Sequence, residues 1–289
     1  MRTVAILSVM VLFTLSVHAA VKPLDVLSSV KGLTEAQFDG EIKRYFNRTT
    51  EEFKQRYLYE ANLAIDLSLF DYNRTVVLLC RGELNAGLGN SPFGLALHPY
   101  SMNFAVNPVL EYRRPEFHTS VGIDHRCFHY IDQRPPLPIV YWNRCFIMVN
   151  SPDRRAVQRS TVLLDTCGHL LRHFSWSGAW GYYVSEFFDV ISPINLMSLT
   201  RPYYLHQFDA SVRYGFASWR GGLVEATSKS MLGFRRSGKG NGYWAEEFGI
   251  EALFVKREYD VSTFVRFTTD GGRFDSKDRL FEFGIKAHK

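Results

Sequence analysis

Apolar and polar side chains alternate with a period of two along most of the chain, beginning near residue 57. In the first such segment, Leu63, Ile65 and Leu67 alternate with Asp66 and Ser68. Successive side chains of a β-strand point to opposite faces of the sheet, so strict alternation indicates a strand with one apolar and one polar face. The pattern therefore predicts β-structure over the greater part of the chain.

About twelve segments carry this alternation, and most run roughly 9–14 residues, the sixth having the weakest pattern. Such segments are longer than the usual strand of a soluble sandwich, and they suit a tilted strand that crosses a bilayer. They lie near residues 57–69, 75–89, 100–113, 117–130, 139–149, 157–166, 174–185, 204–216, 222–232, 244–256, 259–267 and 279–286.

The composition indicates whether the apolar face of these strands points into a core or outward to lipid. Phe, Tyr and Trp make up 15% of the residues, while the mean hydropathy is only −0.13. In a soluble barrel or sandwich, the aromatic side chains of a dozen long strands would overfill one core. With the apolar face turned to lipid the same side chains need no core, and aromatics near strand ends, such as Tyr57, Tyr112 and Tyr204, suit the membrane interfaces. We expect an all-β, antiparallel transmembrane barrel of about twelve strands, with a soluble exported β protein as the alternative.

The amino-terminal region differs from the barrel pattern. A basic start at Arg2, an apolar run over residues 4–17 and the small residue Ala19 predict a signal peptide over residues 1–19. Thr34-Glu-Ala-Gln37 matches a capping box, and apolar residues then recur at helical spacing, which predicts a helix around 35–46. We therefore expect an amino-terminal helical, periplasmic segment over 20–55 and an outer-membrane barrel over 56–289 in a bacterial host. The formal net charge of +5 gives no reason to expect nucleic acid as a partner.

Polar residues interrupt the apolar face of two consecutive segments. In the segment near 117–130 the lipid-facing phase continues through Ile123 to His125 and Cys127, and in the next it includes Asn143. Polar groups at membrane depth are costly unless they are paired. In a hairpin, His125 and Asn143 would be cross-strand neighbours, and His125 could then take a proton from Cys127. Such a set has the nucleophile, base and orienting group of covalent catalysis.

The same residues resemble a known family. Val121-Gly-Ile-Asp-His125-Arg-Cys127 and Trp142-Asn-Arg144 are similar to the outer-membrane phospholipase A barrels, in which a His-x-Ser pair on one strand is completed by the Asn of Trp-Asn-Arg on the next. The resemblance implies a twelve-stranded barrel that hydrolyses membrane phospholipid on its outer wall. It assigns His125 as the general base, Asn143 as the group that orients it, and Cys127 to the nucleophile position. It also implies calcium as a cofactor, without placing the ligands.

The chain departs from the family pattern in the loop between the two motifs, which contains Pro135-Pro-Leu-Pro138 and is longer, and at two points on the first strand. Cys127 replaces the serine, and Phe128-His-Tyr130 stands where the family has Asn-Gly-Arg. A non-catalytic outer-membrane barrel, either a channel or a structural protein, is therefore the alternative function. Membrane lipid is the expected partner in both cases, and a homodimer remains open.

Further polar groups have competing interpretations. A Cys127–Cys145 disulfide would exclude a thiol nucleophile. A metal site could involve Asp124, His125, His129 and Asp132, or His169 and His173. The metal content is therefore unknown from the sequence. The remaining charges on the polar face predict a lumenal network that holds the barrel rigid, and these are Arg81, Glu83, Glu111, Arg113, Asp124, Arg126, Asp209 and Arg213.

Overall fold

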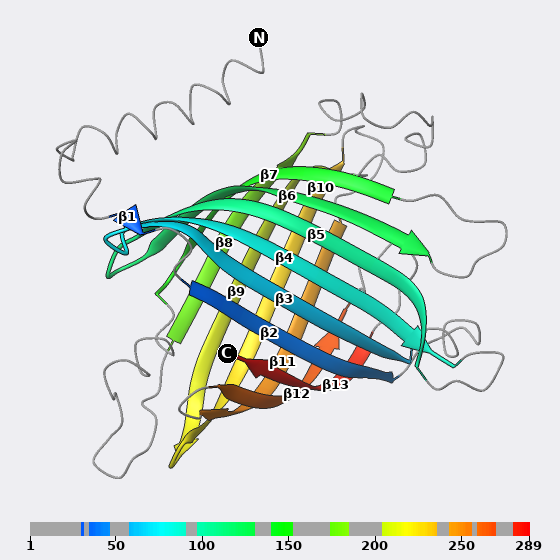
Figure 1. The fold of residues 1–289 in the computed structure, drawn as a ribbon. Helices are drawn as coiled ribbons and strands as arrows, with labels where there is room; N and C mark the ends of the chain where they lie inside the picture. The colour runs from blue at the N-terminus through cyan, green and yellow to red at the C-terminus, as the bar shows by residue number, and fades with distance from the viewer. Residues whose placement is uncertain are drawn as a thin grey trace.

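Twelve antiparallel strands close into a barrel in the computed structural model (Figure 1). The structure describes residues 30–31, 35–46, 58–90, 97–130, 140–152, 174–184, 204–235, 243–255, 259–269 and 280–289. Each strand pairs with its neighbours in the chain, and β13 pairs with β2 to complete the circle. The barrel strands are β2 (Glu35–Phe46), β3 (Tyr59–Tyr72), β4 (Val76–Gly89), β5 (His98–Arg113), β6 (His118–Tyr130), β7 (Val140–Asn150), β8 (Phe174–Tyr183), β9 (Tyr204–Trp219), β10 (Gly222–Arg235), β11 (Tyr243–Val255), β12 (Asp260–Thr268) and β13 (Leu280–His288).

The expected all-β, twelve-stranded antiparallel barrel is thus confirmed. A further two-residue strand, β1 (Val30–Lys31), pairs with the end of β3 outside the ring. The described residues include no helix with the length and hydropathy needed to span a membrane.

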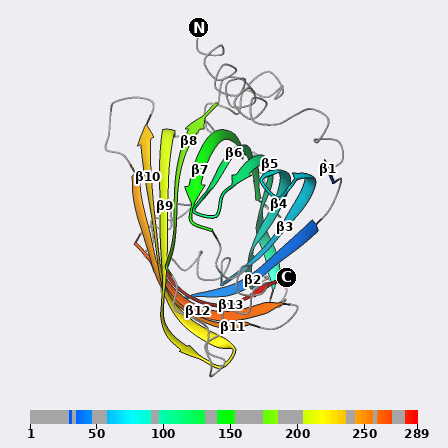
Figure 2. The same cartoon turned by 90° about the vertical axis from the view of Figure 1, so that its left-hand side faces the viewer.

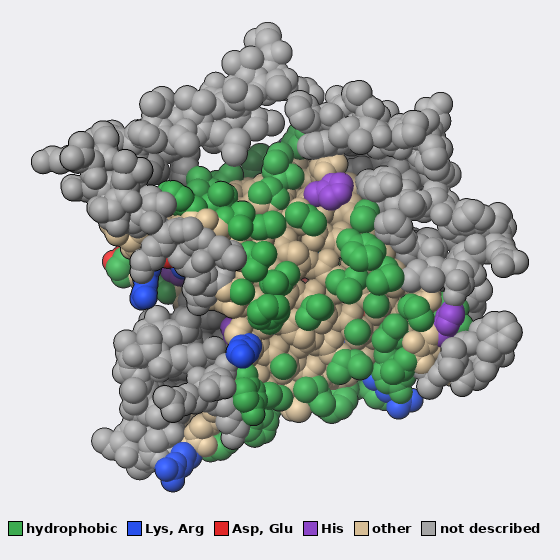
Figure 3. Space-filling view, viewed as in Figure 1, with side chains coloured by type: hydrophobic (Ala, Val, Ile, Leu, Met, Phe, Trp, Pro, Cys, Tyr) green, Lys and Arg blue, Asp and Glu red, His purple; other side chains and the backbone are tan. Residues whose placement is uncertain are grey.

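The alternation seen in the sequence separates an apolar outer wall from a polar lumen. On β13, Phe281, Phe283 and Ile285 are 42%, 47% and 46% exposed, whereas Glu282 between them is 4% exposed. The outer face in Figure 3 is covered by hydrophobic side chains, with Lys and Arg near its margins. A wall of this kind is stable only in contact with hydrocarbon, because in water it would expose a continuous apolar surface.

The prediction of a helix over 35–46 is wrong, because these residues form strand β2. Phe38, Ile42 and Phe46 are spaced at four residues, which fits one side of a helix and also one face of a strand. The structure takes the second option because β2 supplies backbone hydrogen bonds to both β3 and β13, and an open edge in lipid would leave those groups unpaired. The barrel therefore begins at Glu35, not at residue 56.

The strand β2 also takes the place of one expected segment in the count. The other described strands coincide with predicted segments, while the segment near 157–166 lies outside the described residues. The predicted signal peptide, residues 1–19, also lies outside them.

Three tight turns lie at one end of the barrel. Residues 73–75, 114–117 and 220–221 join β3 to β4, β5 to β6 and β9 to β10. The first needs positive φ at Asn73 and Arg74 (51° and 57°), and the last at Gly221 (74°). Short turns face the periplasm in outer-membrane barrels and longer loops face outward. Strand β6 runs away from the tight-turn end, so its second half lies toward the outer leaflet.

The strands form a continuous wall around the lumen (Figure 2), and charged pairs and a small apolar cluster line the inner side of that wall. Val77, Leu79 and Val109 are buried together against Phe146. The charged residues expected in the lumen are paired there, three of them with Asp66, Arg144 and Glu225, which were not among the lumenal charges predicted from the sequence. The pairs are Arg81 with Asp66 at 2.7 Å, Arg113 with Glu111 at 2.6 Å, Arg126 with Glu83 at 2.8 Å and with Asp124 at 2.9 Å, Arg144 with Asp209 at 2.8 Å, and Arg213 with Glu225 at 3.9 Å.

Candidate functional site

His125 and Asn143 are directly opposite each other on β6 and β7. The Nδ1 atom of His125 lies 2.7 Å from Oδ1 of Asn143. Because a carboxamide oxygen only accepts hydrogen bonds, Nδ1 carries the proton and donates it, and the neutral ring then has its free lone pair on Nε2. His125 makes no other hydrogen bond to the described residues, so Nε2 can accept a proton.

Both side chains belong to the lipid-facing wall. His125 is exposed, while Asp124 before it on β6 is 4% exposed and faces the lumen. Across from His125 on β5 lies Val106, which is 52% exposed. Asn143 is 7% exposed, so the histidine covers it. A group placed here is approached from the membrane, not from the lumen.

Cys127 lies on the same face as His125, two residues further along β6 toward the outer rim. Its strand partners are Phe104 on β5 and Tyr141 on β7. No hydrogen bond joins His125 to Cys127 within the described part of the chain. The structure thus brings His125 and Asn143 into contact and leaves Cys127 as a neighbour on the same strand.

Three cysteines lie in the described ranges, Cys80, Cys127 and Cys145, and each is a free thiol; Cys167 lies outside these ranges. Cys145 is opposite Ile123, four residues from Cys127, which is about 13 Å along a strand. Bridged cysteines need Cα atoms within about 7 Å, so the register of β6 and β7 does not allow a Cys127–Cys145 disulfide.

The lumenal side of the same two strands is held by charge. Asp124 on β6 forms ion pairs with Arg126 at 2.9 Å and with Arg144 of β7 at 3.4 Å. Arg144 continues to Asp209 on β9 at 2.8 Å. These pairs cross from β6 to β9 directly behind His125 and Asn143, and they restrict movement of the strands that carry the two residues.

The described residues do not fit a calcium site beside His125. Calcium takes six to eight oxygen ligands, mostly carboxylates and carbonyls. The nearest carboxylates, those of Asp124 and Glu83, face the lumen and are paired with Arg126. No group of three or more His, Cys, Asp or Glu side chains suited to a metal occurs in the described ranges. Asp132, His169 and His173 lie outside these ranges, as does the side chain of His129.

The sequence analysis missed one further polar residue on the lipid-facing wall, His206 of β9. It pairs with Tyr182 of β8, and Phe208 follows it on the same face. The signal was present in the alternation of that segment, where Tyr204, His206 and Phe208 share one phase. It is the same kind of signal that singled out His125.

A closed barrel with a lipid-facing apolar wall and a charged lumen defines this chain as a bacterial outer-membrane β-barrel protein. No protein-family model matches the sequence, and no curated protein matches it. Solved outer-membrane barrels do match the fold. The outer membrane phospholipase A of Escherichia coli is similar with a TM-score of 0.51 and 10% identity, over 89% of this chain and 97% of that chain.

Two further solved barrels, a phospholipase and a porin, also match. The outer membrane phospholipase of Salmonella typhi, a dimer with bound calcium, has a TM-score of 0.50 and 12% identity over 89% of this chain and 90% of its own. The KdgM porin has a TM-score of 0.47 and 8% identity over 86% of this chain and 97% of its own. At identities of 10–12%, the two phospholipase structures show a shared fold and nothing about function.

Proposed function

We propose that this protein hydrolyses acyl esters of membrane phospholipid on its outer wall. The observation that carries the proposal is the 2.7 Å hydrogen bond between His125 and Asn143 on a surface that otherwise meets only lipid. A histidine in hydrocarbon is costly, and a second residue that fixes its tautomer adds a further polar group to that cost. Such an arrangement is typical of a site whose substrate is the lipid itself.

The proposed chemistry uses three side chains. Asn143 accepts the Nδ1 proton of His125 and so leaves Nε2 as the base. Nε2 removes the proton of Cys127 as Sγ attacks the ester carbonyl, and His125 returns that proton to the departing glycerol oxygen. The acyl group is then a thioester on Cys127. Water adds to the thioester as Nε2 takes its proton, the C–S bond breaks, and His125 gives the proton to the departing Sγ of Cys127; the products are a fatty acid and the regenerated thiol.

One of the solved structures with a similar fold supports a catalytic role for an asparagine. One matching structure is an active-site mutant of the Escherichia coli phospholipase in which an asparagine is replaced by alanine, with a TM-score of 0.50. Asn143 occupies a corresponding chemical role in the proposal. Calcium accompanies the Salmonella enzyme, but the described residues of this chain offer no ligand set for it, so no step is assigned to the ion. We also propose that the protein forms a homodimer, as the Salmonella protein does.

The alternative of a channel concerns the lumen. The charge pairs from β6 to β9 and the cluster of Val77, Leu79, Val109 and Phe146 line its inner wall. A barrel of about twelve strands can be filled by side chains such as these, which disfavours an open pore. A structural barrel without activity remains the alternative that the following experiment tests.

The test is release of fatty acid from phospholipid in mixed micelles by the refolded full-length protein. We expect His125→Ala and Cys127→Ala each to lower the rate by about 10²–10⁴, the range for loss of a general base or its partner. Asn143→Ala should lower the rate less, because it removes the orienting bond and leaves the base. Each assay is run with added calcium and with a chelator.

Cys145→Ala is the matched control, because Cys145 is also a free, partly buried thiol on the lipid-facing phase of β7. It should keep the wild-type rate. Activity that survives Cys127→Ala would show that this thiol is not the nucleophile. A refolded wild-type protein with no activity, with or without calcium, would leave the structural barrel as the function.

A further inference from the structure

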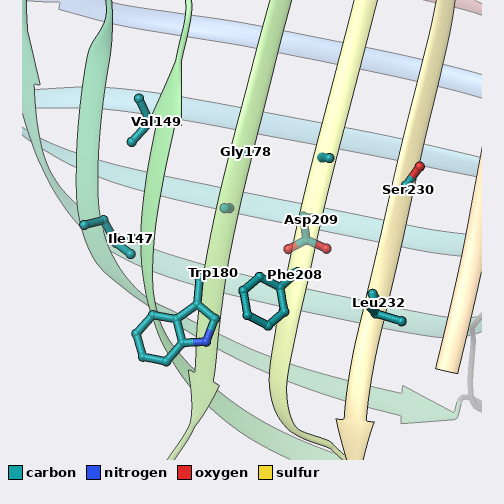
Figure 4. Close-up of a pocket in the computed structure, with 10 residues that line it drawn as sticks. Ile147, Val149, Gly178, Trp180, Phe208, Asp209, Ser230 and Leu232 are labelled. Carbon is teal, nitrogen blue, oxygen red and sulfur yellow. The ribbon is translucent and has the colours of Figure 1, made fainter. Parts of the chain in front are cut away.

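An apolar groove lies on the lipid-facing wall over β7 to β10, separate from His125 and Asn143. Its volume is about 480 Å³, and Figure 4 shows two rows of residues that frame it. One row, formed by residues directly paired across the strands, consists of Ile147, Trp180, Phe208 and Leu232. The adjacent row consists of Val149, Gly178, Ala210 and Ser230. The large side chains of the first row project from the wall. The second row projects less, because Gly178, Ala210 and Ser230 are small, and this difference in height forms the groove.

Gly178 leaves the deepest part of this groove open. A Cβ atom built on Gly178 would meet no other atom within 4 Å. Trp180 and Phe208, by contrast, are 39% and 47% exposed and stand above it. The open space therefore comes from a missing side chain beside two aromatic rings, and the strands themselves need not move to admit a ligand.

His206 lies at the outer end of the groove. Its ring stacks on Trp180 with centroids 5.8 Å apart and an interplanar angle of 21°, and it contacts Tyr182 at 5.3 Å. The ring is partly exposed on the lipid-facing side, Nδ1 is buried, and the described residues offer His206 no hydrogen-bond partner. With Nδ1 buried as the lone-pair nitrogen, Nε2–H is the donor that remains for an external acceptor.

We propose that this groove binds one phospholipid of the outer membrane, with an acyl chain along Gly178 and Ala210 and a headgroup phosphate or ester oxygen accepting the Nε2 proton of His206. The groove is continuous with the surface of the barrel that contacts lipid, so hydrocarbon is the medium that reaches it. Strand β8 runs from Phe174 toward the outer rim at Tyr183, so His206 and Tyr182 lie above the groove, where the polar part of an outer-leaflet lipid lies. The proposal concerns binding and does not depend on hydrolysis at His125.

The groove holds one acyl chain, and His206 supplies a neutral hydrogen-bond donor at its outer end. These features favour a glycerophospholipid over a lipid with many acyl chains and several phosphates. The side chains that frame the groove in its two rows carry no positive charge. A ligand with several phosphates would need Lys or Arg side chains beside it. The described lining instead offers mostly aromatic and aliphatic contacts, with Ser230 and the acidic Asp209 as its polar residues and His206 at the outer end.

The experiment is native mass spectrometry of the delipidated full-length protein, titrated in detergent with phosphatidylethanolamine carrying palmitoyl and oleoyl chains. Wild type should bind one lipid tightly. Gly178→Leu fills the groove and should weaken that binding by about tenfold, since losing contact with about two methylene groups has that effect. His206→Phe keeps an aromatic ring and removes the donor, and it should weaken binding by a few-fold.

Gly40→Leu is the matched control. Gly40 lies between the exposed Phe38 and Ile42 on the far strand β2, and a Cβ atom there also meets nothing within 4 Å. It should bind lipid as wild type does. Equal binding by Gly178→Leu and wild type would overturn the proposal. So would a wild-type dimer that Gly178→Leu converts to a monomer without a change in lipid, because the groove would then hold a second copy of the chain. Repeating the titration with Cys127→Ala separates this result from the proposed hydrolysis.

Discussion

Replacing Lys43 by methionine should destabilise the barrel strongly, because this lysine is the centre of a buried lumenal ion cluster. Its Nζ lies 3.2 Å from Glu282, 3.3 Å from Glu60 and 3.8 Å from Glu41. Lys43 is 7% exposed and Glu60 only 1%. At an effective dielectric constant of about 20, each close pair contributes about 5 kcal/mol of gross attraction, most of which offsets the cost of removing the charges from water.

The net effect follows from what the substitution leaves behind. Lys43→Met keeps the aliphatic stem and removes the ammonium group that the three carboxylates share; Glu41 keeps Arg266 at 3.2 Å, whereas Glu60 and Glu282 lose the lysine at 3.3 Å and 3.2 Å. Breaking a buried ion pair in this way costs about 3–5 kcal/mol, and we expect the free energy of unfolding to fall by that amount. The assay is guanidinium unfolding in phosphatidylcholine vesicles, followed by tryptophan fluorescence.

Lys229→Met is the matched control for this substitution. Lys229 is also a lumenal lysine paired at 3.2 Å, with Glu247, but its side chain is 50% exposed. Solvent screening reduces the value of such a pair, so the loss should stay below about 1 kcal/mol. A Lys43→Met protein as stable as Lys229→Met would refute the view that burial of the cluster determines its contribution.

Three further predictions follow from the same structure. Gly122→Ala should cost about 1–3 kcal/mol in the same unfolding assay, because its Cβ would lie 2.7 Å from the Pro108 carbonyl oxygen and 2.8 Å from Phe146, whereas Gly40→Ala should be nearly neutral; equal effects would contradict this packing. Cys127 should react with a maleimide in detergent without prior reduction, and it should still react in Cys145→Ala; labelling that requires a reductant would mean a disulfide. In planar bilayers the protein should show no large steady conductance, since charge pairs and apolar side chains line its lumen and a barrel of this strand number can be filled by them; porin-like conductance would contradict this.

The alternation of apolar and polar residues was sufficient to predict the class of fold. Each barrel strand in lipid must turn one face outward, and a period of two follows directly from that requirement. The same alternation revealed His125 and Asn143, because a polar residue in the apolar phase is visible in one dimension. His206 was equally visible and was missed, since no neighbouring motif drew attention to it.

Strand β2 shows where local pattern is ambiguous. Apolar residues at a spacing of four fit both a helix and a strand, and a capping-box sequence precedes them. Only closure of the barrel decides between the two, because β2 must hydrogen-bond to β13, which lies at the other end of the chain. No local sequence signal carries that requirement.

Apart from β2, the sequence by itself determined the described strands, the lipid-facing phase and the identity of the polar residues within that phase. The tertiary structure decided the register that places His125 opposite Asn143, the offset that keeps Cys127 apart from Cys145, and the open space at Gly178 between residues of four strands. The physical reason is that a side-chain period belongs to one strand, whereas register, closure and cavity volume depend on pairing between strands, which the hydrogen bonds of the whole barrel settle together.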